Sequence, residues 1–202
     1  MLLYPAQVAE VLAPIAEYPE IQFSLKMRLG WENASECMVL VELLNTLRLS
    51  RIALHARTGK QQYKGHPDLE AFQGFYELCQ HPLYYNGDIE SLSDIRQILI
   101  RFPLLKGVFI GRGLLSSPLL AKEFKGNETF LPEQRMSIYF AFHEELFSAY
   151  SQVLQGETQL LVKMKTLWEY FLPETDRKLL KRIKKSTRLQ QYTESVKAIF
   201  TS

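Results

Sequence analysis

Two glycine turns in the sequence contain the residue types needed to bind an anion. Each turn follows a short apolar run and precedes a stretch with helical spacing. In parallel α/β proteins, turns of this kind place free backbone amides around a phosphate, and an arginine can hold a phosphate through two hydrogen bonds. Asn-Gly alone is typical of a simple turn, so the prediction depends on the strand-to-helix context. The residues that we predict as ligands are Asn86, Gly87, Asp88, Gly111 and Arg112.

Cationic side chains near the ends of two earlier strands add to this predicted site. Lys26 and Arg28 share one face of the first expected strand, because side chains alternate between the two faces. His55 and Arg57 end the second strand in the same way. On a half-exposed strand such charges would simply face water, but a parallel sheet is usually covered on both faces. Polar groups at four successive strand ends therefore favour one binding site.

The spacing of apolar residues predicts the elements that position these side chains. We expect a short helix over 8–15, broken at Pro14, and then four strand-helix units. The expected strands are 21–29, 51–55, 83–85 and 107–110, and the helices that follow them are 35–49, one from 68, 91–102 and one from about 117. Ser91 or Ser93 is expected to cap the third of these helices. This alternation indicates a parallel sheet with right-handed crossovers, either doubly wound or part of a (β/α)8 barrel.

After residue 131 the strand signals end and the pattern becomes helical. The expected helices are 136–154, 158–172, 175–184 and 188–200. We therefore predict an α/β protein with an α/β part over 1–125, followed by a linker and a small all-α domain over 126–202. Trp168, Tyr170 and Phe171 are expected to pack this helical domain.

The C-terminal helices are strongly basic. From 174 to 202 there are eight Lys or Arg residues against three acidic ones, although the net charge of the chain is +2. The basic side chains are Arg177, Lys178, Lys181, Arg182, Lys184 and Lys185, with Lys163 and Lys165 shortly before them. Leu179, Leu180 and Ile183 supply an apolar side that anchors this helix. The run is either a solvated helix face or a contact for a phosphate backbone, which such charges bind without reading its sequence.

Composition excludes several classes of protein. With 202 residues and 47% hydrophobic residues, the chain can bury a substantial core. No apolar run is long enough to cross a bilayer, and no signal peptide is recognisable, so we expect a cytoplasmic protein. Cys37 and Cys79 lack metal-ligand spacing and are expected to be buried or inert thiols, without a metal site. We expect His66, His81 and His143 to be loop or surface residues.

Four ordered motifs resemble those of the tRNA-dihydrouridine synthase family. They are Phe23-Ser-Leu-Lys-Met-Arg-Leu-Gly-Trp31, Leu54-His-Ala-Arg-Thr58 with Gln62-Tyr-Lys-Gly65, Tyr85-Asn-Gly-Asp-Ile89, and Val108-Phe-Ile-Gly-Arg-Gly-Leu114. The helical tail, with Lys163-Met-Lys165 and Trp168-Glu-Tyr170, also looks like the tRNA-binding domain of that family. The resemblance covers nearly the whole chain.

The resemblance implies a (β/α)8 TIM barrel with FMN, followed by a helical domain that binds tRNA. NADPH would reduce the flavin, which would then transfer a hydride to C6 of a uridine that is flipped out of the tRNA. By match of motif, Lys26 and His55 would contact the flavin ring, and Arg28 and Arg57 would lie near substrate or cofactor. The two glycine turns would bind the ribityl phosphate of FMN, and the basic residues of the tail would contact tRNA.

One motif of the family has no match in this chain. Family members carry an Asn-x-Gly-Cys-Pro motif whose cysteine protonates C5 of the uracil, and neither Cys37 nor Cys79 lies in that context. We therefore expect the chain to correspond to barrel strands five to eight plus the helical domain. As a truncated enzyme it would be inactive alone, would hold FMN weakly and would self-associate through open barrel edges. The alternatives are a non-catalytic tRNA-binding fragment and another FMN-binding barrel oxidoreductase.

Overall fold

The structure of the protein is a computed structural model that describes residues 2–201. It divides into two compact units, Met1–Ile110 and Gly111–Ser202. Residue 126, where the sequence predicts the domain boundary, is the last residue of a helix in the second unit.

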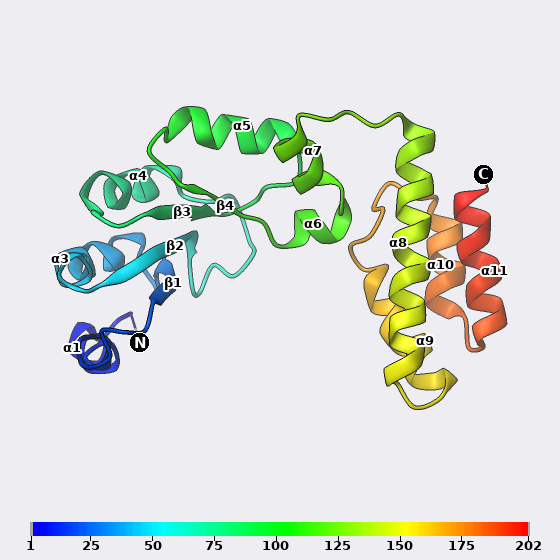
Figure 1. Ribbon diagram of the computed structural model, residues 1–202, viewed down its shortest axis with the longest axis horizontal. Helices are drawn as coiled ribbons and strands as arrows, with labels where there is room; N and C mark the ends of the chain where they lie inside the picture. The colour runs from blue at the N-terminus through cyan, green and yellow to red at the C-terminus, as the bar shows by residue number, and fades with distance from the viewer. Residues whose placement is uncertain (1, 202) are drawn as a thin grey trace. The chain divides into compact units, whose positions relative to one another are not determined.

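The first unit is built on a four-stranded parallel sheet, as the sequence predicts. Its strands are β1 (Phe23–Gly30), β2 (Leu49–Thr58), β3 (Leu83–Asn86) and β4 (Gly107–Phe109), and their order in the sheet is the order in the chain. β2 is longer than expected at both ends and pairs with β1 and β3. Figure 1 shows the helices that connect these strands. This α/β arrangement agrees with part of a TIM barrel.

The helices of the first unit are α1 (Pro5–Leu12), α2 (Pro14–Glu17), the 3-10 helix η1 (Ala34–Leu40), α3 (Val41–Thr46), α4 (Leu69–Leu78) and α5 (Leu92–Arg101). The break at Pro14 is confirmed. The single helix expected over 35–49 is wrong, because a 3-10 helix comes first and β2 begins at residue 49. The Glu36 carboxylate accepts hydrogen bonds from the backbone of Trp31 and Asn33 at 2.7 and 2.8 Å, which tightens the first turns. Ser91, and not Ser93, caps α5.

The helix side of the sheet carries the core of the first unit. Ile52 and Leu54 of β2 are fully buried, and so are Phe72 and Phe75 of α4. The Phe72 ring meets the Tyr85 ring edge-on, with centroids 5.1 Å apart, and this contact fixes α4 against β3. Since side chains alternate along a strand, the opposite face of the sheet carries the polar residues of the predicted site.

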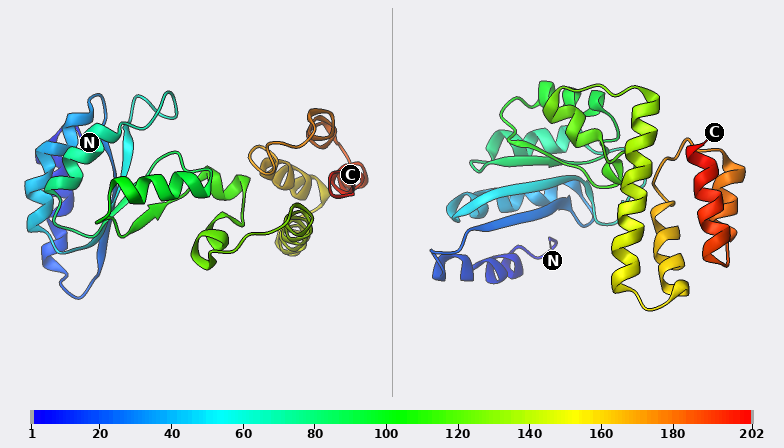
Figure 2. Two further views of the ribbon diagram at one scale, coloured as in Figure 1. Left: turned by 90° about the horizontal axis from the view of Figure 1, so that it is seen from above. Right: turned by 45° about the vertical axis from the view of Figure 1, so that its right-hand side comes forward.

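The secondary structure of the second unit consists of helices alone over its described residues. Its helices are α6 (Arg112–Ser116), α7 (Leu120–Gly126), α8 (Pro132–Val153), α9 (Glu157–Leu167), α10 (Arg177–Lys185) and α11 (Leu189–Phe200). The left view of Figure 2 looks along α8 to α11, which run beside one another. The helix expected from residue 117 is corrected: α6 ends before Ser117, and α7 starts at Leu120. The helix expected over 158–172 ends at Leu167, and a turn region follows.

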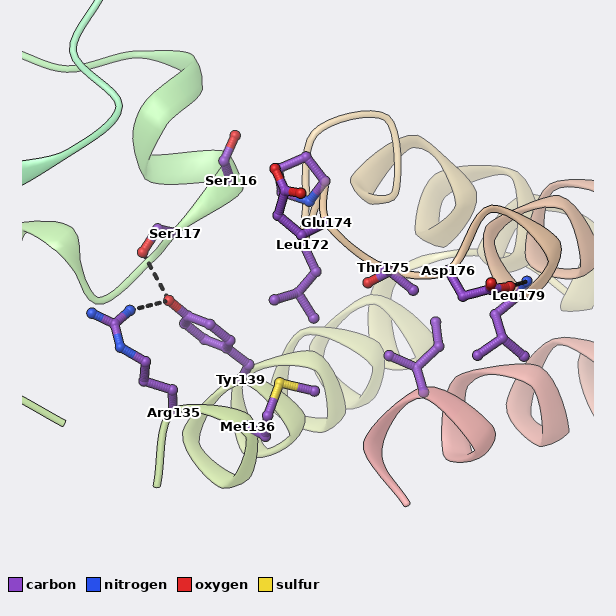
Figure 3. Close-up of a pocket in the computed structure, with 12 residues that line it drawn as sticks. Ser116, Ser117, Arg135, Met136, Tyr139, Leu172, Glu174, Thr175, Asp176 and Leu179 are labelled. Atoms are coloured by element: carbon purple, nitrogen blue, oxygen red, sulfur yellow. Dashed lines mark hydrogen bonds between the residues drawn. The ribbon is translucent and has the colours of Figure 1, made fainter. Parts of the chain in front are cut away.

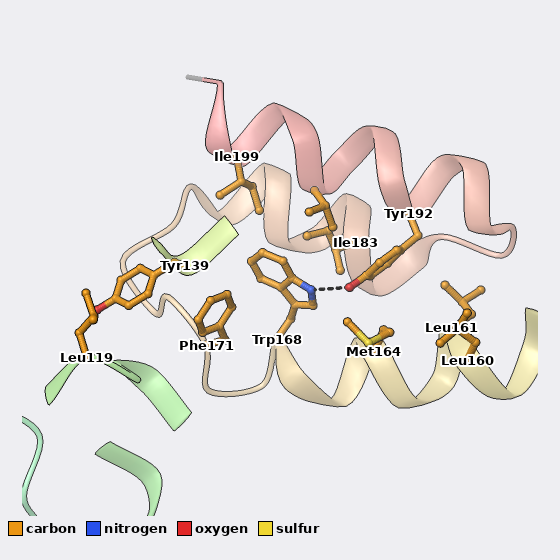
Figure 4. Packing of buried hydrophobic residues seen from close by; sticks show 11 residues of the cluster. Leu119, Tyr139, Leu160, Leu161, Met164, Trp168, Phe171, Ile183, Tyr192 and Ile199 are labelled. Carbon is orange, nitrogen blue, oxygen red and sulfur yellow. Dashed lines mark hydrogen bonds between the residues drawn. The ribbon is translucent and has the colours of Figure 1, made fainter. Parts of the chain in front are cut away.

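Aromatic and aliphatic residues together form the core of the second unit (Figure 4). Trp168 and Phe171 are buried as predicted, with ring centroids 5.4 Å apart, but Tyr170 is exposed, which corrects the expectation for that residue. Ile183 of α10 is fully buried, and the partly buried Leu179 and Leu180 pack against the same cluster. The predicted apolar anchor of the basic helix is therefore confirmed.

A buried hydrogen-bond chain links three helices or helix ends in this core. The Trp168 indole N–H donates to the Tyr192 hydroxyl oxygen at 3.0 Å, and that hydroxyl lies 2.6 Å from Nε2 of His143. Because the Glu144 carboxylate can only accept, Nδ1 of His143 carries the proton that is donated to it at 3.0 Å, and Nε2 of the neutral ring then accepts from the Tyr192 hydroxyl. His143 is thus a core residue, and its expected place on the surface is wrong. Burial lowers the pKa of His143.

Candidate functional site

The pairing of the strands brings the predicted cationic residues of β1 and β2 together. Arg28 pairs in register with His55, and His55 pairs with Asn86 of β3. Residues in register on parallel strands share a face, and Lys26 lies on that face because it is two positions before Arg28. Three neighbouring strands therefore contribute polar side chains to one patch, which we call the strand-end cluster: Lys26, Arg28, His55 and Asn86.

Electrostatics makes the strand-end cluster receptive to negative charge. Burial, together with the nearby charges of Arg28, Lys26 and Arg57, lowers the pKa of His55 to about 4. Desolvation and Arg28 also lower the pKa of Lys26. Both shifts arise because an additional positive charge is costly at this place. An anionic ligand would lower that cost. Because its pKa is about 4, His55 is a neutral hydrogen-bonding group at neutral pH.

Arg57 is buried and forms an ion pair that the sequence did not indicate. Its guanidinium donates to both carboxylate oxygens of Asp88 at 2.7 and 2.6 Å, and it also donates to the carbonyl of Gly65 at 2.6 Å. The arginine is only 1% exposed. The two residues, predicted as a substrate contact and a phosphate ligand, therefore lie together, with Arg57 neutralising the carboxylate of Asp88. Nε of Arg57 is buried without a hydrogen-bond partner.

Both arginines also hold the loop that follows β2. Arg28 donates to the carbonyls of Thr58 and Gln62 at 2.7 and 3.3 Å, while Arg57 holds Gly65. Gln62 and Gly65 have positive φ angles of 52° and 63°, so the backbone curls tightly here. The motif Gln62-Tyr-Lys-Gly65, part of the family resemblance, was the sequence signal at this loop. The loop therefore forms part of the wall of the strand-end cluster.

The turn after β3 is shaped by close packing. The amide of Asn86 donates to the carbonyl of Phe109 at 2.9 Å and so ties β3 to β4. A Cβ atom at Gly87 would lie 2.0 Å from the hydroxyl oxygen of Tyr85, so the glycine is required by that ring. This steric reason for Gly87 was not apparent from the sequence.

Gly111 and Arg112 begin the second unit. Gly111 precedes the five-residue helix α6, and a Cβ atom at Gly111 would meet no atom within 4 Å. Within the second unit, Ser116 donates to the carbonyl of Arg112 at 3.1 Å. The role of these two residues as phosphate ligands stays a prediction.

Among the predicted tRNA contacts, the two lysines of α9 have structural partners. Lys165 donates to the carbonyl of Ser186 at 2.5 Å, next to the C-terminal end of α10. The ammonium of Lys163 lies 5.3 Å from the ring centroid of Tyr150, at a distance typical of a cation–π contact. The remaining six basic residues all lie on the exposed side of α10: Arg177, Lys178, Lys181, Arg182, Lys184 and Lys185.

A cavity of about 440 Å³ in the second unit is lined by none of the predicted site residues (Figure 3). At one end, the Tyr139 hydroxyl lies 2.8 Å from Ser117 and accepts a hydrogen bond from Arg135 at 3.2 Å. Arg135 also pairs with the buried Glu123. These polar groups thus have partners within the protein. Over residues 2–201 no cluster of His, Cys, Asp or Glu suited to a metal is found, and no helix in that range is long and apolar enough to span a membrane.

The two cysteine thiols are held in the protonated form. Burial raises the pKa of Cys37 to about 11, and burial also raises the pKa of Cys79. The predicted inert character of both thiols agrees with this environment.

A parallel strand-helix sheet with a cationic patch near its carboxyl-terminal edge is typical of α/β proteins that bind anionic ligands. Comparison with known proteins narrows this class. A family model described as dihydrouridine synthase matches residues 1–201, and the chain therefore belongs to the dihydrouridine synthase family.

Several curated relatives are bacterial proteins named tRNA-dihydrouridine synthases, some of them as probable. The chain is similar to tRNA-dihydrouridine synthase B of Vibrio vulnificus, with 26% identity over 137 residues that cover 66% of this chain and 42% of the relative. It is also similar to a probable tRNA-dihydrouridine synthase of Aquifex aeolicus, with 34% identity over 128 residues, or 62% of this chain and 40% of the relative. The chain thus spans about two fifths of the length of these relatives.

Proposed function

We propose that the chain takes part in the FMN-dependent, NADPH-driven reduction of uridine to dihydrouridine in tRNA. Membership of the family supports the reaction. The observation that supports FMN as the cofactor is the strand-end cluster. There Lys26, Arg28 and the neutral His55 lie on one face of the sheet. When bound there, FMN would supply the hydride chemistry, between NADPH and C6 of the uracil.

The residues of the first unit fit an anionic, aromatic cofactor. The exposed ammonium of Lys26 would hold negative charge on the flavin ring, and His55 would add a hydrogen bond without adding charge. Arg28 and Arg57 would keep the loop after β2 in place. Gly111 and Arg112 are proposed as phosphate ligands because a guanidinium beside free backbone amides suits a phosphate group.

Neither cysteine of the chain fits the role of proton donor to C5 of the uracil. Cys37 donates its S–H to the carbonyl of Ala34 at 3.3 Å, and Cys79 ends α4, a helix on the other side of the sheet from the strand-end cluster. We therefore propose that this chain alone lacks the group that completes the reduction.

A titration of FMN fluorescence tests the cofactor site. We expect quenching that saturates at micromolar or weaker Kd, because four strands offer only one wall to the ring. Lys26→Ala should weaken binding by about tenfold, the effect of one charge-assisted contact of about 1.4 kcal/mol. Arg48→Ala removes an exposed cation next to β2 and serves as the control, with binding unchanged. A failure to bind FMN, or equal losses in both variants, would contradict the proposed site.

The basic face of α10 favours a second candidate, a tRNA-binding module without catalysis. Such a module would bind tRNA in a salt-dependent way and would show neither FMN binding nor NADPH consumption. The FMN titration therefore separates the two candidates.

A further inference from the structure

We infer that the groove between α10 and α11 binds the phosphodiester backbone of RNA, and that Glu194 limits how tightly it does so. This inference rests on the proposed function, because it assigns the tRNA contact to one groove. It concerns one side of α10, and it leaves Arg177, Lys184 and Arg188 outside the binding surface.

The groove has a volume of about 400 Å³ and cationic walls. Lys178, Lys181, Arg182 and Lys185 line it from α10, and Gln191 and Glu194 line it from α11. The four cations follow the spacing i, i+3, i+4, i+7, so they form one stripe along a single side of the helix. Figure 1 shows α10 and α11 as neighbours in the second unit. A stripe about two turns long can meet more than one phosphate of a nucleic-acid strand.

The polar groups of Ser186 and Ser195 in the groove already have hydrogen-bond partners within the protein. The cationic groups are therefore the ones that can bind a ligand. The buried Ser186 hydroxyl donates to the carbonyl of Ile183 at 2.7 Å, and Lys165 donates to the carbonyl of Ser186. The Ser195 hydroxyl donates to the carbonyl of Gln191 at 2.7 Å. Within residues 2–201, no ion pair with an acidic side chain is found for the four cations of the stripe.

The packing of α10 favours a polyanion over a membrane surface. A basic amphipathic helix binds a membrane by inserting its apolar side between lipids. In this structure that side is occupied, because Ile183 is fully buried and Leu179 and Leu180 pack against the aromatic core. Only the cationic side is exposed, and its partner is therefore recognised by charge alone.

Glu194 introduces a negative charge into this cationic groove. Its carboxylate accepts a hydrogen bond from Gln190, its neighbour on α11, at 3.0 Å. A carboxylate beside bound phosphates repels them, so it lowers affinity and keeps the contact reversible. Glu194 lies outside the sequence motifs and the basic run, so the sequence did not indicate a role for it.

Fluorescence anisotropy with an unmodified tRNA transcript tests the groove with charge-matched variants of the full chain. The groove variant is Lys178→Ala/Lys181→Ala/Lys185→Ala, and the control variant is Arg177→Ala/Lys184→Ala/Arg188→Ala. Each removes three exposed positive charges. We expect the groove variant to lose at least about tenfold in affinity and to flatten the slope of log Kd against log salt by roughly 2, whereas the control should lose about threefold or less.

A second pair of variants tests Glu194. Glu194→Gln should raise tRNA affinity by about two- to fivefold at low salt, and Glu145→Gln, an exposed acid on α8, should leave it unchanged. Equal losses in the two triple variants, or equal gains in the two glutamine variants, would overturn the inference while leaving tRNA binding intact. Binding to phosphatidylserine vesicles in place of tRNA would also overturn it. If the unaltered chain does not bind tRNA, the inference and the tRNA part of the proposed function both fail, whereas the FMN titration judges the cofactor site separately.

Discussion

At the scale of single residues, the position of Arg57 was predicted correctly, but its contacts were not. Its place at the end of β2 was predicted, but its guanidinium pairs with Asp88, which lies 31 positions further along the chain. No local pattern indicates that pairing, because it depends on β3 lying beside β2. Removing one partner of such a pair leaves an uncompensated charge, so replacing either residue alone should destabilise the site before any ligand binds.

His55 provides a prediction at the same scale. Because nearby cations contribute to its low pKa, Arg28→Ala should raise the pKa of His55 from about 4 toward its ordinary value of about 6.5. An NMR titration of the imidazole signals measures this shift. The control Arg48→Ala should leave the pKa of His55 where it is.

The sign of the pH effect on stability follows from the same shift. Since the pKa of folded His55 lies below that of the unfolded chain, protonation favours unfolding, and stability falls as pH drops from about 6.5 toward 4. Arg28→Ala should reduce this loss of stability for the first unit. A pKa of His55 that does not move in Arg28→Ala would contradict the electrostatic account of the cluster.

At the scale of elements, the sequence predicts the strands well and the helix ends less well. Four apolar runs followed by glycine or polar turns sufficed to place β1 to β4, because alternation and turn residues are local signals. The 3-10 helix η1 and the break at Ser117 arise from side-chain caps and packing between elements, which the spacing of apolar residues does not encode. His143 illustrates the same limit, since its partner Tyr192 is 49 positions away.

The hydrogen-bond chain between α8, α11 and Trp168 gives a prediction for the helical unit. Tyr192→Phe removes the hydroxyl and leaves a buried indole N–H and His143 Nε2 without their partner. We expect a loss of about 1–3 kcal/mol in the free energy of unfolding, the cost of unsatisfied buried polar groups. Urea denaturation followed by circular dichroism measures it. The control is Tyr170→Phe, because Tyr170 is exposed and takes no part in these hydrogen bonds. It should change the free energy of unfolding by less than about 0.5 kcal/mol.

At the scale of the whole molecule, the sheet has two edges among its described residues. β1 pairs only with β2, and β4 pairs only with β3 within residues 2–201. Open edges present unpaired backbone groups to other chains. The family resemblance predicted this feature from the motif order, whereas the burial of individual side chains could be known only from the structure.

We therefore predict that the protein self-associates through its sheet edges. Size-exclusion chromatography with light scattering should give a mass above 23.5 kDa that rises with concentration. Ser24→Lys places a charge on exposed β1 and should shift the equilibrium toward the monomer, since lysine on an edge strand opposes pairing. Ser148→Lys on exposed α8 is the matched control. A monomer at every concentration, or equal behaviour of both variants, would contradict the prediction.

The two tryptophans of the chain are divided between its two units, and this gives each unit its own optical signal. Trp31 is 48% exposed, so its emission should be red-shifted and readily quenched by iodide, whereas the 2% exposed Trp168 should emit at shorter wavelength and resist the quencher. A Trp31→Phe variant would then report only on the helical unit, and Trp168→Phe only on the sheet. Unfolding of one unit before the other can thus be followed without attaching any dye.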